Sequence, residues 1–461
     1  MIWWCRDTHP AQPAKFRWPS ATMAPDSISA PPHAFTTFPM TDAPLNLDLA
    51  ACRRRQTRLL EAVADQRLDL LLLQLPEHVQ WLTGPRTAWY FQPAVALSAE
   101  GRATLCAPVK WKGEAAADEI VRYEAQWHST LRNDQRAAST AALFAALSTT
   151  SAALPNAIPD AIPNAEWTAA SSSTAPSTAP STAPSTTESG ACVSSSVGGR
   201  GGRRRIGVEF SCATRHWALP ADVELVDIEP TLYRLRRRKD PDELAMLRHA
   251  IAASGAMYER ARAMIRPGVT ELEVFSELQA AAVASLGEPT TATGNDYQCG
   301  ARGGPPRAGR RAEAGELYIL DLGPAYRGYF ADNCRTLAVS EPDERQLEAW
   351  RWLVGALELV EQTVKPGVSA RELFHSVQRL LDQAPVGVFN HHLGHGIGLF
   401  PHEAPHLNPH WDDRFEPGDV FTAEPGLYAP ELRAGIRLEN DYLVTEDGVE
   451  RLSNFPLDLR L

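Results

Sequence analysis

Hydrophobic positions in the first half of the chain alternate between two spacings, one typical of helices and one typical of strands. Apolar residues within 59–68 recur on one face of a helix, and the leucine run 70–73 is typical of a buried strand. Residues 94–97 and 103–106 predict two further strands, because a Glu-Gly turn signal separates these apolar runs. This alternation predicts an α/β domain.

The segment 136–204 interrupts this pattern with a composition dominated by Ala, Ser, Thr and Pro. The tetrapeptide Ser-Thr-Ala-Pro is repeated within 173–185. A tract with so few large apolar residues cannot offset its ordering entropy, so we predict a disordered insertion. The strand-like runs 206–209 and 223–226 would complete the interrupted domain after it. A plain interdomain linker is the alternative interpretation.

Shifts of composition also indicate the limits of the domains. Residues 1–45 are rich in Pro, Ala, Ser and Thr, and we predict a disordered leader or start-site extension, with Met23 and Met40 as candidate start sites. An N-terminal domain is expected over 46–232 and a second domain over 233–461. The start of the chain has no apolar signal region, and no run reaches the roughly 20 apolar residues that span a bilayer. We therefore expect neither export nor membrane insertion.

The second domain contains the same local pattern twice. A helix start at 240–243, with Asp at the N-cap, Pro at N1 and Glu at N3, opens a long predicted helix. The segment 265–275 then recurs as 364–374, 99 residues later. Both copies carry a capping box, which begins at Thr270 and at Ser369. This repetition predicts two homologous halves, with the functional site where the halves meet.

Four acidic residues and one histidine stand in apolar, glycine-flanked strand segments of this domain. A lone acidic residue at a strand end usually has a structural role, so none of them is informative by itself. Together they are too costly to bury unless a cation pairs with them. The two earliest belong to a predicted hairpin whose carboxylates can face one point. The candidate metal ligands are Asp321, Asp332, His395, Glu424 and Glu439.

The charge of this set predicts the number and the kind of metal ions. Four ionised carboxylates carry four negative charges, so one divalent ion leaves two of them uncompensated, whereas two ions neutralise the set. Oxygen-rich ligation with one imidazole suits Mn²⁺ first, with Co²⁺, Zn²⁺ or Fe²⁺ as alternatives. Two such ions can polarise a carbonyl group and activate water near neutral pH, which favours amide hydrolysis.

Net charge and cysteine content narrow the range of partners and compartments. With 45 Lys and Arg against 56 Asp and Glu, the 461-residue chain has a formal net charge of −11, which disfavours nucleic acid and anionic membranes as partners. The 7 scattered cysteines include no Cys-x-x-Cys pair, so neither a disulfide framework nor a zinc ribbon is indicated. A reducing, cytoplasmic location is expected.

The motifs around the candidate ligands resemble those of the pita-bread metallopeptidases, which include methionine aminopeptidase, aminopeptidase P, prolidase and creatinase-like proteins. The resemblance covers about 46–135 and 205–461. It implies an α/β (α+β) fold, with a creatinase-like N-terminal α/β domain followed by a duplicated pita-bread catalytic domain. The motifs that carry it in combination are 321–336, 391–405, 421–428 and 435–441.

The resemblance also implies roles for individual residues. All five candidate ligands would bind metal, with Asp332 and Glu439 bridging two ions. His402 would help to stabilise the tetrahedral intermediate, and His392 would lie over the substrate. Arg437 matches an arginine that lies on the same strand face as the ligand Glu439 and supports the site from behind.

An N-terminal domain of this kind is typical of aminopeptidase P and prolidase, in which it caps the pocket and contributes to dimer contacts. The resemblance therefore implies a homodimeric, metal-dependent exopeptidase acting on short peptides, with Xaa-Pro aminopeptidase as the leading hypothesis. Xaa-Pro dipeptidase, a non-peptide hydrolase or lyase on the same fold, and an inactive binding module are the alternatives. The intact ligand set argues against the inactive module.

Three further features shape these expectations. Relatives that cleave at proline usually carry another pocket histidine upstream of the first aspartate, where this chain has Gly304. This difference predicts a wider, less proline-selective pocket unless Arg302 or Arg307 fills the gap.

Cys334 is interpreted as a small packed side chain, with an oxidisable thiol beside the metals as the alternative. The basic run 236–239 is interpreted as a solvated face.

Overall fold

The computed structural model describes residues 45–87, 91–125, 135–150, 203–212 and 222–461, with side chains for all of these except 148–150. The expected leader, residues 1–45, therefore lies outside the described residues apart from its last position. No helix within the described ranges is both long and apolar enough to cross a membrane. The described chain forms an N-terminal part and a C-terminal part, each built on its own β-structure.

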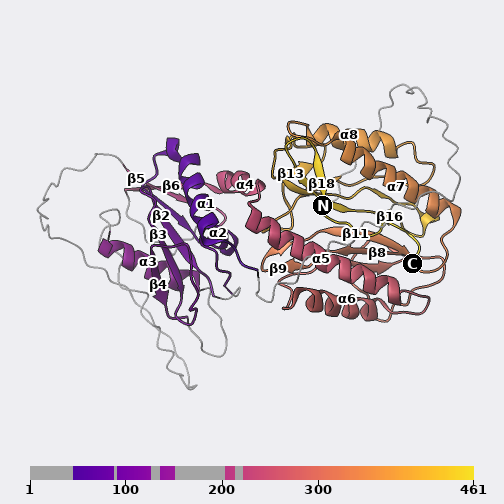
Figure 1. Cartoon of the computed structure of the whole chain (residues 1–461), viewed down its shortest axis with the longest axis horizontal. Helices are drawn as coiled ribbons and strands as arrows, with labels where there is room; N and C mark the ends of the chain where they lie inside the picture. Colours follow the sequence, from indigo (N-terminus) through magenta and orange to yellow (C-terminus); the bar gives the residue numbers. More distant parts are fainter. Residues whose placement is uncertain (1–44, 88–90, 126–134, 151–202, 213–221) are drawn as a thin grey trace, which may run out of the picture. The chain divides into compact units, whose positions relative to one another are not determined.

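The N-terminal part is built around a six-stranded sheet in the order β4-β3-β2-β1-β5-β6 (Figure 1). Strand β2 pairs antiparallel with both β1 and β3, whereas β5 and β6 extend the sheet from β1 in parallel and β4 pairs with β3 in parallel. All five predicted strands of this part are confirmed, as β1, β2, β3, β5 and β6. Helix α4 runs through the expected domain boundary at 232/233, which stays a prediction. The elements are α1 (Leu49–Ala62), the 3₁₀ turn η1 (Ala64–Gln66), β1 (Leu70–Leu73), α2 (Pro76–Thr83), β2 (Ala94–Ser98), β3 (Ala103–Pro108), β4 (Glu119–Tyr123), α3 (Arg136–Thr150), β5 (Arg204–Val208), β6 (Val223–Asp227) and α4 (Glu229–Arg237).

The disordered insertion expected at 136–204 is wrong in its first residues, because they form helix α3. This helix packs against β2, β3 and β4. Leu143, Phe144 and Leu147 are buried there. An Ala-rich run with three large apolar side chains on one helical face combines high helix propensity with a surface that can be buried. Residues 151–202 lie outside the described part of the chain.

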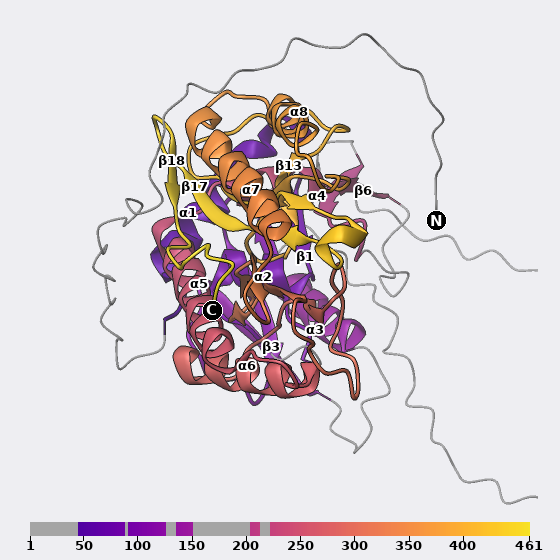
Figure 2. The same cartoon turned by 90° about the vertical axis from the view of Figure 1, so that its right-hand side faces the viewer.

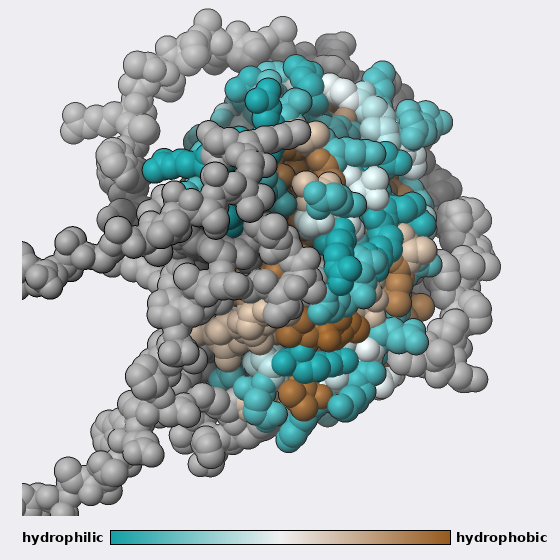
Figure 3. Space-filling model, turned by 90° about the vertical axis from the view of Figure 1, so that its left-hand side faces the viewer, coloured by the Kyte–Doolittle hydropathy of each residue, from teal (hydrophilic) through white to brown (hydrophobic). Residues whose placement is uncertain are grey.

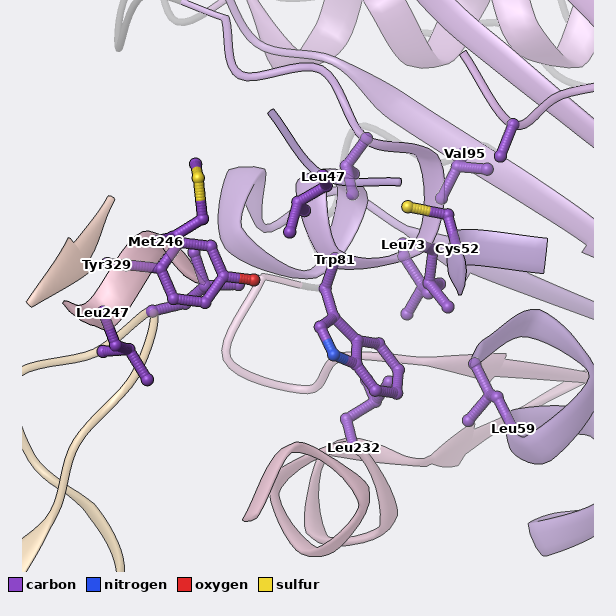
Figure 4. Packing of buried hydrophobic residues seen from close by; sticks show 14 of the residues in the cluster. Leu47, Cys52, Leu59, Leu73, Trp81, Val95, Leu232, Met246, Leu247 and Tyr329 are labelled. Atoms are coloured by element: carbon purple, nitrogen blue, oxygen red, sulfur yellow. The ribbon is translucent and has the colours of Figure 1, made fainter. Parts of the chain in front are cut away.

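One hydrophobic cluster connects the N-terminal part with the C-terminal part. Figure 4 shows Trp81 of α2 beside Leu232 of α4, with Met246, Leu247 and Tyr329 of the C-terminal part in the same cluster. Each of these side chains is at most 1% exposed. Complete burial of one large apolar side chain contributes about 1.5–3 kcal/mol, so the cluster is a substantial link between the two parts.

The C-terminal part contains a three-stranded sheet, β11-β8-β7, and a five-stranded sheet, β13-β12-β14-β17-β18, besides two short two-stranded sheets. Helices α5 and α6 pack on each other, as do α7 and α8, and both pairs lie on the outside of the strands (Figure 2). The elements are α5 (Pro241–Met264), α6 (Glu271–Leu286), β7 (Asp296–Cys299), β8 (Leu317–Leu322), β9 (Ala325–Tyr326), β10 (Tyr329–Phe330), β11 (Asn333–Ala338), α7 (Glu344–Thr363), α8 (Ala370–Leu381), β12 (Gly394–Gly396), β13 (Glu403–Leu407), β14 (Val420–Ala423), β15 (Gly426–Leu427), the 3₁₀ turn η2 (Pro430–Leu432), β16 (Ile436–Arg437), β17 (Asn440–Val444) and β18 (Val449–Arg451).

The two helix pairs correspond to the halves that the sequence repeat predicts. The capping box at Thr270 is complete, since its hydroxyl accepts the Glu273 N–H at 3.1 Å and the Glu273 carboxylate accepts the Thr270 N–H at 2.8 Å. Ser369 accepts the Glu372 N–H at 3.1 Å, but its hydroxyl donates to Asp412. Among the described residues no bond returns from Glu372 to the Ser369 N–H, so only half of the second box forms.

The interpretation of the basic run 236–239 as a solvated face is wrong for three of its four residues, since only Arg238 is exposed. Arg236 and Lys239 both pair with Glu403 on β13, and the three residues are only 2%, 5% and 9% exposed. Arg237 forms a two-point pair with Asp419, at 2.6 and 3.0 Å. Buried ionic groups need such partners, and these partners are too remote in the sequence for a local charge pattern to show them.

Large apolar side chains are exposed at scattered positions of the described surface. The face shown in Figure 3 has hydrophobic areas interspersed among hydrophilic residues. Among the described aromatic side chains, Phe210 and Trp411 are the most exposed, at 53% and 56%. Scattered apolar residues are normal on protein surfaces, so an exposed aromatic residue becomes informative only where it borders a cavity.

Replacing Glu403 by Gln should lower the free energy of unfolding, because Arg236 and Lys239 would stay buried without an anion. Burial by itself raises the pKa of Glu403, but the two cations lower it below its usual value. We expect a loss of about 3–5 kcal/mol, measured by urea unfolding followed by circular dichroism. Glu416→Gln is the matched control, since this side chain is 62% exposed and 3.7 Å from Arg237; it should change stability by less than about 1 kcal/mol. Equal, small changes in both variants would contradict this role of Glu403.

Candidate functional site

The structure brings the five predicted metal ligands together, although they come from both halves of the C-terminal part. Asp321 lies on β8, and Asp332 immediately precedes β11, the antiparallel partner of β8. His395 lies in β12, Glu424 follows β14 and Glu439 precedes β17. Strand β14 pairs with both β12 and β17, so the second-half side chains converge on one region.

Donor atoms from these strands approach one another at distances that suit a shared cation. His395 Nε2 lies 3.6 Å from Asp332 Oδ2 and 3.6 Å from Glu424 Oε1. One donor atom each from His395, Glu424 and Glu439 lie within 4.8 Å of one another, as do donor atoms from Asp332, His395 and His402. Bonds from histidine nitrogen or carboxylate oxygen to a divalent ion such as Zn²⁺ are about 2.0–2.2 Å long, so a cation fits between these donor atoms.

Burial and mutual repulsion oppose ionisation of the carboxyl groups. Burial, followed by the charges of Asp321 and Glu424, raises the pKa of Asp332 well above its usual range. Burial and the charges of Asp321 and Asp332 do the same to Glu439, and burial raises the pKa of Glu424 to about 8. Glu439 Oε2 is buried with no hydrogen-bond partner among the described residues. The donor set therefore fits divalent cations, whose charge would offset the repulsion.

Neighbouring groups orient the ligand side chains. The Thr422 hydroxyl donates to Glu439 Oε1 at 2.5 Å, and Arg437 donates to Asp321 Oδ2 at 2.8 Å. His395 Nδ1 lies 3.1 Å from the carbonyl oxygen of the next residue. This acceptor favours the proton on Nδ1, which leaves the Nε2 lone pair directed at the carboxyl groups.

The glycines on both sides of His395 allow β12 to lie close to its neighbours. A Cβ atom at Gly394 would lie 1.9 Å from the Thr422 carbonyl oxygen, and one at Gly396 would lie 2.1 Å from the Ala404 carbonyl oxygen. A side chain at either position would push β12 away from an adjacent strand. The Gly-His-Gly sequence therefore fixes how deeply the imidazole sits among the carboxyl groups.

The two other predicted histidines also face the cluster. The rings of His402 and His395 stack, with centroids 3.7 Å apart and an interplanar angle of 15°. His392 Nδ1 lies 3.4 Å from Glu424 Oε1. Burial and the neighbouring imidazoles lower the pKa of both His392 and His402. Each is therefore neutral at pH 7 and can donate one hydrogen bond.

The sequence analysis missed a chain of hydrogen bonds that runs from Asp321 into the pocket. The Arg437 guanidinium that donates to Asp321 also donates to the Tyr428 hydroxyl, at 3.3 Å, and pairs with Asp296. The Tyr428 hydroxyl lies 3.1 Å from His391 Nε2. Burial lowers the pKa of His391 to about 3. Tyr428 and His391 stand within the motifs recognised from the sequence, but only the fold shows that they meet.

Gly304 occupies a backbone position that disfavours a side chain. Its φ is +126°, and a Cβ atom there would lie 2.8 Å from a neighbouring glutamine side chain. Its N–H donates to Asp296 Oδ1 at 2.6 Å. Arg302 instead lies beside the hydrogen-bonded chain, with its guanidinium 4.0 Å from the centroid of the Tyr428 ring, whereas Arg307 pairs with a buried glutamate. A histidine at position 304 would therefore be strained.

Cys334 is a packed side chain, as expected, and it also borders the carboxyl groups. It is 0% exposed and clusters with Ile319 and Tyr428. It stands directly opposite Asp321 in the β8–β11 pair, and its sulfur lies within 4.8 Å of donor atoms from Asp321 and Glu439. Burial raises the pKa of the thiol well above its usual range, which disfavours the reactive thiolate.

A cavity of about 430 Å³ borders His395 and His402. Its far walls are formed by Phe374 and Gln378 of α8 and by the loop after β13, including Trp411. This volume lies within the range of small-molecule sites in proteins. The arrangement therefore combines a cation-binding cluster, neutral hydrogen-bond donors and a space for a small ligand.

Two family profiles match the chain. The profile of metallopeptidase family M24 matches residues 245–446, which include every candidate ligand, and that of the Creatinase/Prolidase N-terminal domain matches residues 55–175. An uncharacterized peptidase of Bacillus subtilis (strain 168), YqhT, is 30% identical over 267 residues, or 56% of this chain and 75% of that protein. An uncharacterized peptidase of Staphylococcus aureus (strain MW2) is 31% identical over 234 residues, or 50% of this chain and 66% of the relative.

Solved structures show the same fold. A Xaa-Pro dipeptidase from Bacillus anthracis superposes with a TM-score of 0.66 at 24% identity, covering 89% of this chain and 100% of that one. Prolidase from Pyrococcus furiosus gives 0.62 at 20% identity, covering 86% and 99%. An X-Pro aminopeptidase from Thermotoga maritima gives 0.64 at 19% identity, covering 88% and 99%. From its profile match, its relatives and its fold, the chain belongs to metallopeptidase family M24, with a creatinase-like N-terminal domain ahead of a pita-bread catalytic domain.

Proposed function

We propose that this protein is a metal-dependent exopeptidase that hydrolyses the N-terminal bond of short peptides, with Xaa-Pro bonds preferred. One observation carries the proposal: Asp321, Asp332, His395, Glu424 and Glu439 converge in a site where burial and repulsion raise the carboxyl pKa values. Bound cations would allow these groups to be ionised together. Membership of a metallopeptidase family supports the same conclusion.

Two divalent ions are proposed for this site, with Mn²⁺ as the first choice and Co²⁺, Zn²⁺ or Fe²⁺ as alternatives. Glu439 is a proposed bridging ligand because it belongs to two donor groups, one with Asp321 and one with His395 and Glu424. Asp332 is the other proposed bridging ligand, because its carboxyl group interacts with that of Asp321 and lies 3.6 Å from His395 Nε2. When bound, such ions polarise the scissile carbonyl and lower the pKa of water.

The chain's own residues orient the substrate around that centre. His402 is proposed to donate its imidazole N–H to the scissile carbonyl oxygen as negative charge develops there. His392 is proposed to lie over the substrate, next to Glu424. Arg437 is proposed to position Asp321, because its guanidinium counteracts the effect of burial on that carboxyl pKa.

Two observations favour short peptides as substrates. The cavity of about 430 Å³ has the size of a small-ligand site. The N-terminal part also packs onto the C-terminal part through a shared hydrophobic cluster. Xaa-Pro dipeptidase is the second candidate, because the fold matches solved structures with that name and with the name prolidase. A cytoplasmic homodimer remains the expected form of the protein.

Metal content and a peptide panel test this function. Metal-reconstituted protein should contain close to two equivalents per chain by elemental analysis and should cleave Ala-Pro-Ala, with loss of activity on chelation. Glu424→Ala should lose metal and lower kcat/KM by at least about 100-fold, the upper limit for residues that only orient a ligand. Glu446→Ala, at an exposed position, should behave as the natural chain does. Full activity without bound metal would refute the mechanism, and failure to cleave any peptide would favour a non-peptide substrate.

Replacing His402 by Ala separates turnover from metal binding. We expect kcat to fall by about 10²–10³-fold, as for loss of one donor to a developing oxyanion, while metal content stays that of the natural chain. His375→Ala, on α8 outside the cavity lining, is the matched control and should keep its activity. Loss of metal in the His402 variant would instead identify His402 as a ligand, since its ring lies within reach of Asp332 and His395.

A further inference from the structure

The cavity beside the predicted metal centre has a neutral lining. Its walls include imidazole, amide and aromatic side chains, and no Asp, Glu, Lys or Arg is found among its described lining residues. The carboxyl groups of the cluster lie behind the lining residues His392, His395 and His402. The site therefore has an acidic side and a neutral side, and these two sides suit different parts of a peptide.

Trp411 is an exposed aromatic side chain on an anchored loop of that neutral wall. Its side chain is exposed (56% for the residue), whereas its backbone is held in place: the backbone N–H groups of Trp411 and His410 donate to Asn408 Oδ1 at 3.3 and 2.8 Å. His406 holds the indole from one side, with ring centroids 4.8 Å apart, and is itself fixed by Asp413 at 2.8 Å. A large apolar face thus borders the cavity and is not covered by the described chain.

The charges of a peptide determine which part of it can occupy the neutral side. The N-terminal ammonium group needs an anionic partner, because an unpaired cation is costly to bury. The cavity offers no such partner, because no Asp or Glu is found among its described lining residues, so the N-terminal residue lies outside the cavity, on the side of the metal ligands. The residue that follows the scissile bond, which is neutral when it is proline, then lies in the cavity bordered by Trp411.

Proline at that position has to be recognised by the shape of its ring. Its nitrogen carries no hydrogen once it is acylated, so no backbone acceptor can select it. Aromatic-lined surfaces are the usual binding sites for proline-rich peptides. Trp411, with His406 behind it, offers such a surface, whereas Gly304 has no side chain with which to make this contact.

We propose that the Trp411 indole packs against the proline ring of Xaa-Pro substrates and is the residue that gives this chain its proline preference. The inference rests on the proposed peptidase function and names the group that determines its specificity. It predicts that proline selectivity is retained without a histidine at position 304.

The test compares Ala-Pro-Ala with Ala-Ala-Ala as substrates of the metal-reconstituted natural chain and its variants. In Trp411→Ala, the ratio of kcat/KM for the proline peptide over the alanine peptide should fall about three- to tenfold, as expected for loss of one aromatic contact. Trp411→Phe should keep most of the ratio, because it keeps an aromatic ring. Phe210→Ala is the control, since Phe210 is similarly exposed, at 53%, and lies outside the cavity lining; it should leave the ratio unchanged.

Each other result would overturn the inference. An unchanged ratio in Trp411→Ala, or an equal loss on both peptides, would assign Trp411 a supporting role without selectivity. Leu-Ala-Ala serves as a third substrate: a fall in the kcat/KM of Trp411→Ala for Leu-Ala-Ala, but not for Ala-Ala-Ala or Ala-Pro-Ala, would place the N-terminal side chain in the cavity. If the natural chain cleaves neither tripeptide, the proposed function fails and this inference fails with it. If the natural chain cleaves both equally, the proposed exopeptidase activity stands, whereas the proposed preference for Xaa-Pro bonds and this inference both fail.

Discussion

The site depends on one electrostatic constraint: four carboxyl groups share a buried space in which their charges repel one another. Burial first, and then this repulsion, raise the pKa values of Asp332 and Glu439; two unit charges 4 Å apart interact by about 4 kcal/mol at an effective dielectric constant of 20. The surrounding residues offset part of this repulsion, with Thr422 donating to Glu439 and Arg437 donating to Asp321. Divalent cations would offset the rest, so we expect metal binding and the stability of these strands to be coupled.

Glu403 links the carboxyl cluster, through its neighbour His402, with the N-terminal part of the chain. It directly follows His402 and accepts the Phe400 N–H at 3.0 Å. Arg236 at the end of α4 and Lys239 just after it pair with the same carboxylate, and α4 also contacts α1 of the N-terminal part. The position of His402 beside the candidate metal ligands is therefore tied to the junction between the two parts.

The segment around Gly304 and the loop around Trp411 make different contributions. Gly304 donates its N–H to Asp296, which in turn pairs with Arg437, so this segment supports the guanidinium that orients Asp321. The loop after β13 instead presents an apolar ring to the cavity. Support of the candidate ligand Asp321 and the apolar wall of the cavity are thus provided by separate segments of the chain.

Local regularities of the sequence were sufficient to predict the strand 70–73 and the helix start at 240–243, and to single out the five candidate ligands. Hydrophobic spacing, helix capping and glycine-flanked motifs each involve residues that are close together in the sequence, so they can be recognised without the fold. The helix at 136–150 was missed because the prediction treated 136–204 as one tract, and the Ser, Thr and Pro residues of its later part outweighed the apolar residues of the helix. The convergence of the ligands was only a hypothesis until the strands were placed. The burial of Arg236 against Glu403 and the contact of Tyr428 with His391 were decided by tertiary structure alone. Ion pairs and hydrogen bonds depend on distance in space, and the sequence by itself does not show which distant segments the sheets and helix pairs bring into contact.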